Sequence, residues 1–154
     1  MMNNKKTNSS RNRYFILIGS PENWHTSLNQ NVWGFTENSK GSWNTIKEGD
    51  FLAFYVTSPI KKVVGFGHIG KKFINNNLIW NDEKLFKRTL WKYKVEIKPT
   101  YVCENWNDGI DLPPIVLRVS RREIDENTFS DLIKKADLSW GSHISKEFGK
   151  EIKN

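Results

Sequence analysis

The feature that most constrains the fold is a series of short apolar runs separated mostly by loops rather than by long helices. Apolar residues that are continuous or alternate over a few positions are typical of β-strands. The runs that predict strands are Tyr14–Ile18, Phe51–Val56, Lys61–Phe73, Trp91–Ile97 and Ile115–Val119. Parallel neighbours need long crossovers, so these connections favour a mixed or antiparallel sheet. The sequence therefore predicts an α+β fold, an open β-barrel of about five to six strands with short helices at its rim.

Glycine spacing in the third run predicts a sharply bent strand. Gly65, Gly67 and Gly70 lie inside a β-rich segment, where glycine marks a bend or the close approach of another backbone. Their spacing also matches the Gly-x-Gly-x-x-Gly fingerprint of dinucleotide-binding folds, but no helical pattern follows. We therefore expect a curled sheet here and no dinucleotide site.

Short helices are predicted between and after the strands. The first directly follows the first strand, because Ser20 is a candidate N-cap and Pro21 suits the first helical position. The pattern predicts short helices over 21–28, 81–88 and 126–136, at most one helical turn over 42–47, and loops over 31–40 and 99–111.

Length and charge indicate one mildly basic domain with polar ends. A chain of 154 residues is long enough for a single apolar core. The formal net charge is +7, of which residues 1–13 supply +4 and the remainder +3. We expect a disordered basic tail over 1–13, which is either a solubilising or a phosphate-binding arm. A folded domain is expected over 14–145 and a C-terminal tail over 146–154.

Several classes of function lack their signature residues. No run approaches the ~18 apolar residues of a membrane span, and the N-terminus has no hydrophobic region of a secretory signal. Cys103 is the one cysteine, and the histidines at 25, 68 and 143 have no metal-ligand spacing. We expect a cytoplasmic monomer with no catalytic residues, no metal, no cofactor and no membrane partner.

Tryptophan is the unusual component of this composition. Seven tryptophans are spread along the chain, and Trp24 and Trp33 lie in the polar segment Gly19–Gly34. These two side chains either pack in the core or form part of a binding site for a flat ligand. The alternation of its neighbours assigns Trp91 to the core. The roles of the tryptophans at 43 and 106 stay open.

Recognition of a nucleobase is the chemistry that suits this segment. A base taken out of its stack needs aromatic faces to stack on and a few groups that hydrogen-bond to its edge. Trp24 and Trp33 are candidate walls, and Trp80, after the bent strand, is a candidate further wall. Ser20 and Asn23 are candidate edge readers. Packing in the core is the alternative role for each tryptophan.

The order of these motifs resembles the EVE domain family of the PUA-like superfold. The resemblance spans residues 14–119. It rests on an apolar strand followed by Gly-Ser-Pro-Glu-Asn-Trp, then Val-Trp-Gly, Lys-x-Gly-Asp before Phe-Leu-Ala-Phe-Tyr-Val, and Val-Val-Gly-Phe-Gly. It implies a PUA-like open barrel of the kind formed by small stand-alone prokaryotic members of the family.

The segment 20–33 is also similar to YTH domains, which read 6-methyladenine through an aromatic cage. The similarity places Trp33 at the first cage tryptophan and Trp80 at the second. It implies that Asn23 meets the edge of the base. Pro21 stands where YTH domains have a polar residue, which removes one hydrogen-bonding partner. The resemblance to EVE domains instead implies a modified cytosine in DNA, so both bases and both nucleic acids stay open.

These observations predict a non-enzymatic module that binds DNA or RNA through a modified base, in the first place a methylated one, held in an aromatic cage. The candidates for contact with the base are Trp33, Trp80, Trp24, Ser20, Asn23 and Gly34, and those for contact with the backbone are Arg88 and Arg118. One alternative is a general PUA-type RNA-binding domain that uses charge and shape without a base pocket. The other is a small PUA-like hydrolase, which would need a lysine or threonine beside a carboxylate.

Overall fold

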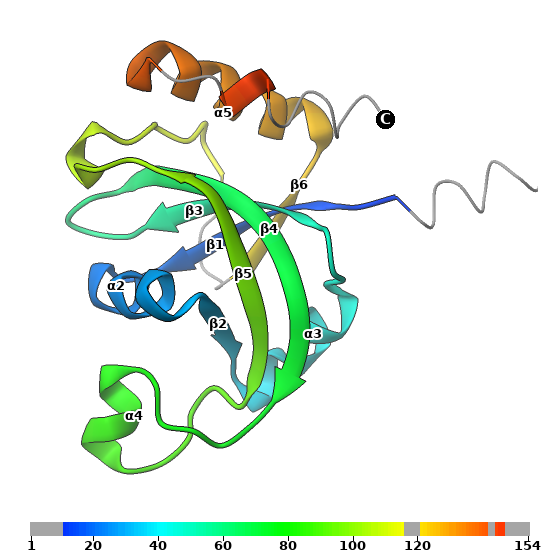
Figure 1. Cartoon of the computed structure of the whole chain (residues 1–154), viewed down its shortest axis with the longest axis vertical. Helices are drawn as coiled ribbons and strands as arrows, with labels where there is room; N and C mark the ends of the chain where they lie inside the picture. Colours follow the sequence, from blue (N-terminus) through cyan, green and yellow to red (C-terminus); the bar gives the residue numbers. More distant parts are fainter. Residues whose placement is uncertain (1–10, 116–120, 142–143, 147–154) are drawn as a thin grey trace, which may run out of the picture.

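The computed structural model describes residues 11–115, 121–141 and 144–146, and its centre is one curled sheet (Figure 1). The strands are β1 (Tyr14–Gly19), β2 (Val32–Phe35), β3 (Phe51–Val56), β4 (Lys62–Ile74), β5 (Tyr93–Val102) and β6 (Arg121–Ile124). Their order in the sheet is β2-β5-β4-β3-β1-β6. Among these strands β1 and β3 pair in parallel, and the other pairs are antiparallel. The predicted α+β open barrel is confirmed.

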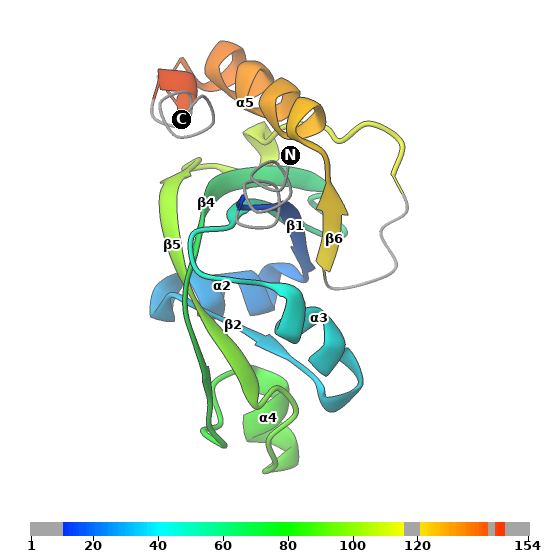
Figure 2. The same cartoon turned by 90° about the vertical axis from the view of Figure 1, so that its right-hand side faces the viewer.

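Short helices surround the sheet, and capping residues mark where two of them begin. The helices are α2 (Pro21–Gln30), α3 (Lys40–Thr45), α4 (Asn81–Phe86) and α5 (Glu126–Trp140), with 3-10 turns at Glu37–Ser39 and Trp106–Asp108. Ser20 caps α2 by accepting a hydrogen bond from a backbone N–H, and Asp125 caps α5 in the same way. Figure 2 shows α5 at one end of the sheet and α4 at the other. In the part of the chain described, no helix is both long and apolar enough to cross a bilayer.

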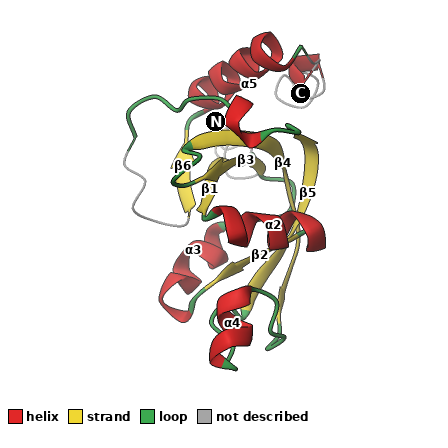
Figure 3. Ribbon diagram, turned by 90° about the vertical axis from the view of Figure 1, so that its left-hand side faces the viewer, coloured by secondary structure: helices red, strands yellow, loops and turns green. Residues whose placement is uncertain are grey.

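Alternating side chains of β1 divide the core into two layers. Phe15 and Leu17 pack in one apolar cluster with Trp24 of α2. Ile16 packs in a second cluster with Phe129 of α5. Figure 3 shows α2 below β1 and β3 and α5 above them. Because both faces of this strand are covered, its sequence is a continuous apolar run rather than an alternating one.

The structure corrects two of the strand predictions and leaves a third untested. Residues 31–40, predicted as a loop, contain β2, which pairs with β5. β5 begins at Tyr93 rather than at Trp91 and continues into the predicted loop over 99–111. The last strand is β6; of the strand predicted over 115–119, residues 116–119 lie outside the described residues. Pairing with neighbours specifies such short strands more than their own apolar pattern does.

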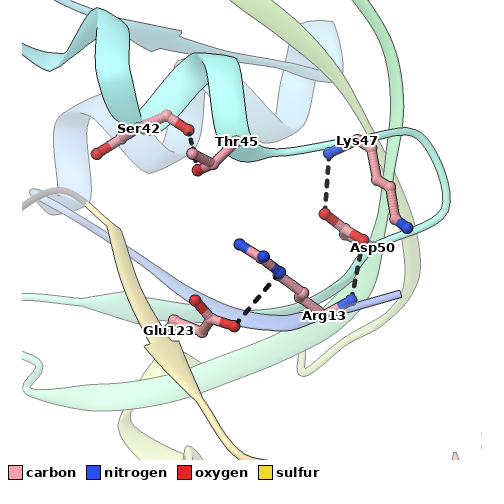
Figure 4. Close-up of polar contacts among 6 residues, drawn as sticks. All are labelled: Arg13, Ser42, Thr45, Lys47, Asp50 and Glu123. Atoms are coloured by element: carbon pink, nitrogen blue, oxygen red, sulfur yellow. Dashed lines mark hydrogen bonds and ion pairs between the residues drawn. The ribbon is translucent and has the colours of Figure 1, made fainter. Parts of the chain in front are cut away.

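A buried carboxylate joins the start of β1 to the turn before β3 (Figure 4). Asp50 is completely buried and accepts hydrogen bonds from the backbone N–H groups of Arg13 at 3.0 Å and Lys47 at 2.9 Å. Burial raises the pKa of this carboxyl group, and the two hydrogen bonds oppose that rise. Gly49, with φ of +93°, supplies the left-handed backbone of the turn. These contacts hold β1 beside β3 and so help to position the end of β1, where the candidate site begins.

Candidate functional site

A small cavity lies where the end of β1, the start of α2 and β2 meet the segment that contains α4. Its volume is about 160 Å³. An engineered apolar cavity of ~150 Å³ is large enough to admit a benzene ring. The lining residues are Ile18, Gly19, Asn23, Trp33, Gly34, Trp80 and Trp91. None of these side chains is charged and three are tryptophans, so the cavity suits one flat, uncharged ring with a polar edge.

The three tryptophans of the cavity come from three separate elements. Trp33 lies on β2, Trp80 is the N-cap residue of α4, and Trp91 precedes β5. The rings of Trp80 and Trp91 meet edge to face, with centroids 5.4 Å apart. Trp33 is 5% exposed and Trp80 3% exposed, so both wall the cavity from within the fold. Asn23, half-buried in the first turn of α2, is the one polar side chain of the lining.

Trp24 supports the cavity from behind and is not among its lining residues. It is completely buried, and its ring centroid lies 4.5 Å from that of Trp33 and 4.9 Å from that of Phe54. Its indole N–H donates to the backbone carbonyl of Tyr55 at 2.8 Å. The structure therefore places Trp24, predicted as a candidate wall, in the core, where it holds Trp33 in position.

One buried carboxylate fixes the backbone at both Trp80 and Trp91. Glu83 of α4 has no exposed surface. Its Oε1 accepts hydrogen bonds from the backbone N–H groups of Ile79 at 2.8 Å and Trp80 at 3.3 Å. Its Oε2 accepts from those of Leu90 and Trp91, both at 2.9 Å. Because a charged acceptor makes stronger hydrogen bonds than a neutral one, Glu83 ties both ends of this segment together.

A buried lysine accompanies this carboxylate. Lys94 of β5 is fully buried, and its Nζ donates to the backbone carbonyl of Asn75 at 3.0 Å. Burial lowers the pKa of Lys94, and the charge of Glu83 partly offsets that effect. Sequence analysis singled out neither residue, because nothing in the pattern marks a Glu or a Lys as buried.

Two glycines let the tryptophans approach the backbone closely. A Cβ atom at Gly34 would lie 2.5 Å from Cβ of Trp91 and 2.8 Å from Cη2 of Trp80. A Cβ atom at Gly19 would lie 2.7 Å from Cη2 of Trp33. Contacts this short force the neighbouring atoms to move, so the cavity keeps its present shape with glycine at both positions.

The structure brings together four of the residues predicted to contact a base. Trp33, Gly34, Trp80 and Asn23 all line the same cavity. Ser20 caps α2, and its hydroxyl oxygen accepts from the backbone N–H of Asn23 at 3.1 Å. The capping oxygen thus positions Asn23, and Ser20 is not among the lining residues.

Trp91 was assigned to the core, and the structure corrects this assignment. It is half-buried, lies before the first residue of β5 and lines the cavity. The apolar alternation from which its role was inferred begins at Trp91, two residues before the strand itself begins. The polar residues over 87–89 are the signal that could have placed Trp91 in a loop.

Of the two arginines predicted to contact a nucleic-acid backbone, the structure describes one. Arg88 is exposed and lies between α4 and Trp91. Arg118 lies outside the described residues. Within residues 11–115, 121–141 and 144–146, no group of three or more His, Cys, Asp or Glu side chains could hold a metal ion.

Comparison with solved structures identifies the fold; no family model and no curated protein matches the sequence. The protein Rpa0253 of Rhodopseudomonas palustris superposes with a TM-score of 0.57 at 16% identity, over 82% of this chain and 94% of that one. The YTH domain of Mmi1 in complex with RNA gives 0.58 at 15% identity, over 90% and 87%. The YTH domain of Zygosaccharomyces rouxii MRB1 in complex with N6-methyladenosine RNA gives 0.53 at 14% identity, over 82% and 87%. The chain therefore has a YTH-like fold.

Gly34→Ala is expected to destabilise the protein and to reduce the cavity. The added methyl group would meet Trp91 and Trp80 at distances that force both side chains to shift. Overpacking of this kind costs about 1–3 kcal/mol. Chemical denaturation followed by tryptophan fluorescence measures the change in the free energy of unfolding.

Gly41→Ala is the matched control, because a Cβ atom at this position of α3 has nothing within 4 Å. Alanine is preferred to glycine in a helix, so this variant should be at least as stable as the wild type. Equal stability of the Gly34 and Gly41 variants would contradict the close approach of the two tryptophans to Gly34.

Proposed function

We propose that this protein is a non-enzymatic binding module that takes one methylated adenine of a single-stranded RNA into the tryptophan cavity. The observation that carries the proposal is a cavity of about 160 Å³ lined by three indoles and one amide. An aromatic side chain that stacks on a base contributes about 1–3 kcal/mol to binding. The MRB1 YTH domain, which shares this fold, was solved with N6-methyladenosine RNA, and this supports adenine as the base.

The chemistry of the lining suits a methylated base that is neutral. The indoles of Trp33, Trp80 and Trp91 offer apolar faces to both the ring and a methyl group. The amide of Asn23 carries both donors and an acceptor, so it can pair with the polar edge of a base. Among the described residues that line the cavity, none is a carboxylate that could compensate a cationic ring. A modified cytosine in DNA, which the resemblance to EVE domains implies, is the alternative ligand.

Basic side chains beside the cavity supply contacts to phosphates. Lys84, Lys87 and Arg88 are exposed in or directly after α4, the helix that Trp80 begins. The acids of this helix offset them little, because Glu83 is buried and Asp82 is the exposed one. Phosphate contacts position a nucleic acid without reading its sequence. We therefore assign Arg88 and the two lysines to the backbone and the cavity to the base.

The binding test compares short single strands of RNA and DNA that carry N6-methyladenine, 5-methylcytosine or no modification. Fluorescence anisotropy should show the tightest binding for RNA with methyladenine. Equal affinity for modified and unmodified RNA, with a steep salt dependence, would indicate a general RNA-binding domain instead. A preference for methylcytosine in DNA would contradict the assignment of the base.

Trp91→Ala should weaken binding of the methylated RNA about 5- to 150-fold, which corresponds to one stacking contact. Trp91 is half-buried and belongs to neither core cluster, so the fold should persist. Trp106→Ala is the control for loss of a half-buried indole, because Trp106 stacks on His25 and packs against the first core cluster but does not line the cavity. Equal losses in the two variants would contradict the role of the cavity.

Arg88→Ala should weaken binding of methylated and unmethylated RNA by the same factor. Loss of one phosphate contact should also lower the slope of log affinity against log salt concentration by about one. Lys134→Ala, which removes an exposed charge from α5, is the control and should leave both quantities unchanged. A larger effect on methylated than on unmethylated RNA would place Arg88 at the base rather than at the backbone.

A further inference from the structure

We propose that Trp33 is a hydrogen-bond donor to the bound base as well as a wall of the cavity. The ligand would place an acceptor atom of its ring against Nε1–H of this indole. The inference rests on the proposed function, because it assumes that a base occupies the cavity. It goes further by stating what the base must carry: a free acceptor atom on a neutral ring.

The starting observation is a buried donor without a partner. Nε1 of Trp33 is buried and makes no hydrogen bond within the described part of the chain. Buried indole N–H groups usually have a partner, because an unpaired one forfeits its bonds to water. Such an exception in a folded protein therefore needs an explanation.

Three other buried or partly buried indoles, those of Trp24, Trp43 and Trp80, do not share this property. Trp24 donates to the carbonyl of Tyr55, as described above, and Trp43 donates to the carbonyl of Lys94 at 2.9 Å. Trp80, which lines the cavity beside Trp33, donates to Oγ of Ser27 at 3.0 Å. The protein thus satisfies each of these donors internally and leaves unpaired the one on Trp33.

The lining itself offers Trp33 little to bond with. Six of its seven residues are glycine, isoleucine or tryptophan, which have no side-chain acceptor, and the seventh is Asn23. An acceptor brought by the ligand would satisfy the donor at the moment of binding. N6-methyladenine has three such ring nitrogens, N1, N3 and N7. A base that is methylated or protonated at the nitrogen concerned cannot accept this bond and should bind less well.

The test combines altered RNA with altered protein. The RNAs carry N6-methyladenine with N1, N3 or N7 replaced by C–H, and they are compared with the parent RNA for wild type and Trp33→Phe. Phenylalanine keeps an aromatic wall and removes the donor. One of the three replacements should weaken binding to the wild type on the order of tenfold. The same nitrogen replacement should not change the affinity of Trp33→Phe. If another ring nitrogen bonds to Asn23, its replacement should weaken binding equally in both proteins.

A second variant at position 33 separates loss of the hydrogen bond from loss of packing around the side chain. Benzothienylalanine at position 33 has nearly the shape of tryptophan, with sulfur in place of N–H, and should give the same pattern as phenylalanine. The outcome that excludes the hydrogen bond from Trp33 is that each altered RNA loses the same factor in affinity for the wild type as for both variants at position 33. If the wild type does not distinguish methylated from unmethylated RNA, the proposed function fails instead, so the two failures are distinguishable.

Discussion

The carboxylate of Glu83 is the group on which the shape of the cavity most depends. Four backbone N–H groups, two from each end of the segment that carries Trp80 and Trp91, converge on its two oxygens. A carboxylate that is buried without partners is costly, so burial of Glu83 depends on all of these donors being in place. By fixing the backbone on both sides of α4, this one side chain holds the indoles of Trp80 and Trp91 next to each other at the cavity.

The opposite wall depends on the sheet. The parallel pairing of β1 with β3, and the contacts of Asp50 with Arg13 and Lys47, fix where β1 ends. The chain then turns directly into α2, whose buried Trp24 packs against Trp33 of β2. The glycines at the end of β1 and in β2 leave room for the rings. Contacts within the protein therefore hold the walls of the cavity in place, and little ordering should be needed on binding.

Local signals predicted much of this fold. The apolar runs at β1, β3 and β4 indicate strands because their residues are buried, and Ser20 with Pro21 marks the start of α2 because capping depends on a few adjacent residues. Trp33 and Trp80 were matched to a cage through resemblance, and the structure brings them to one cavity. Their contact with a base stays a prediction.

Long-range contacts account for what the sequence did not predict. β2 has four residues, one of them glycine, and exists because it pairs with β5. Glu83 looks like an ordinary exposed helix residue, and its role depends on backbone groups that the chain brings to it from both sides. The role of Trp91 follows from its position two residues before the start of β5. None of these features can be derived from local periodicity or composition.

The most direct test of this account is the effect of Glu83→Gln on both stability and binding. Glutamine has nearly the same shape, but its amide nitrogen cannot accept a hydrogen bond. The backbone N–H groups that now bond to one of the two carboxylate oxygens, about two of them, would therefore face a donor. Each buried group left unsatisfied costs about 1–3 kcal/mol. We predict a clear loss in the free energy of unfolding together with weaker binding of RNA that carries N6-methyladenine. Wild-type stability and wild-type affinity in this variant would contradict the claim that Glu83 organises the cavity.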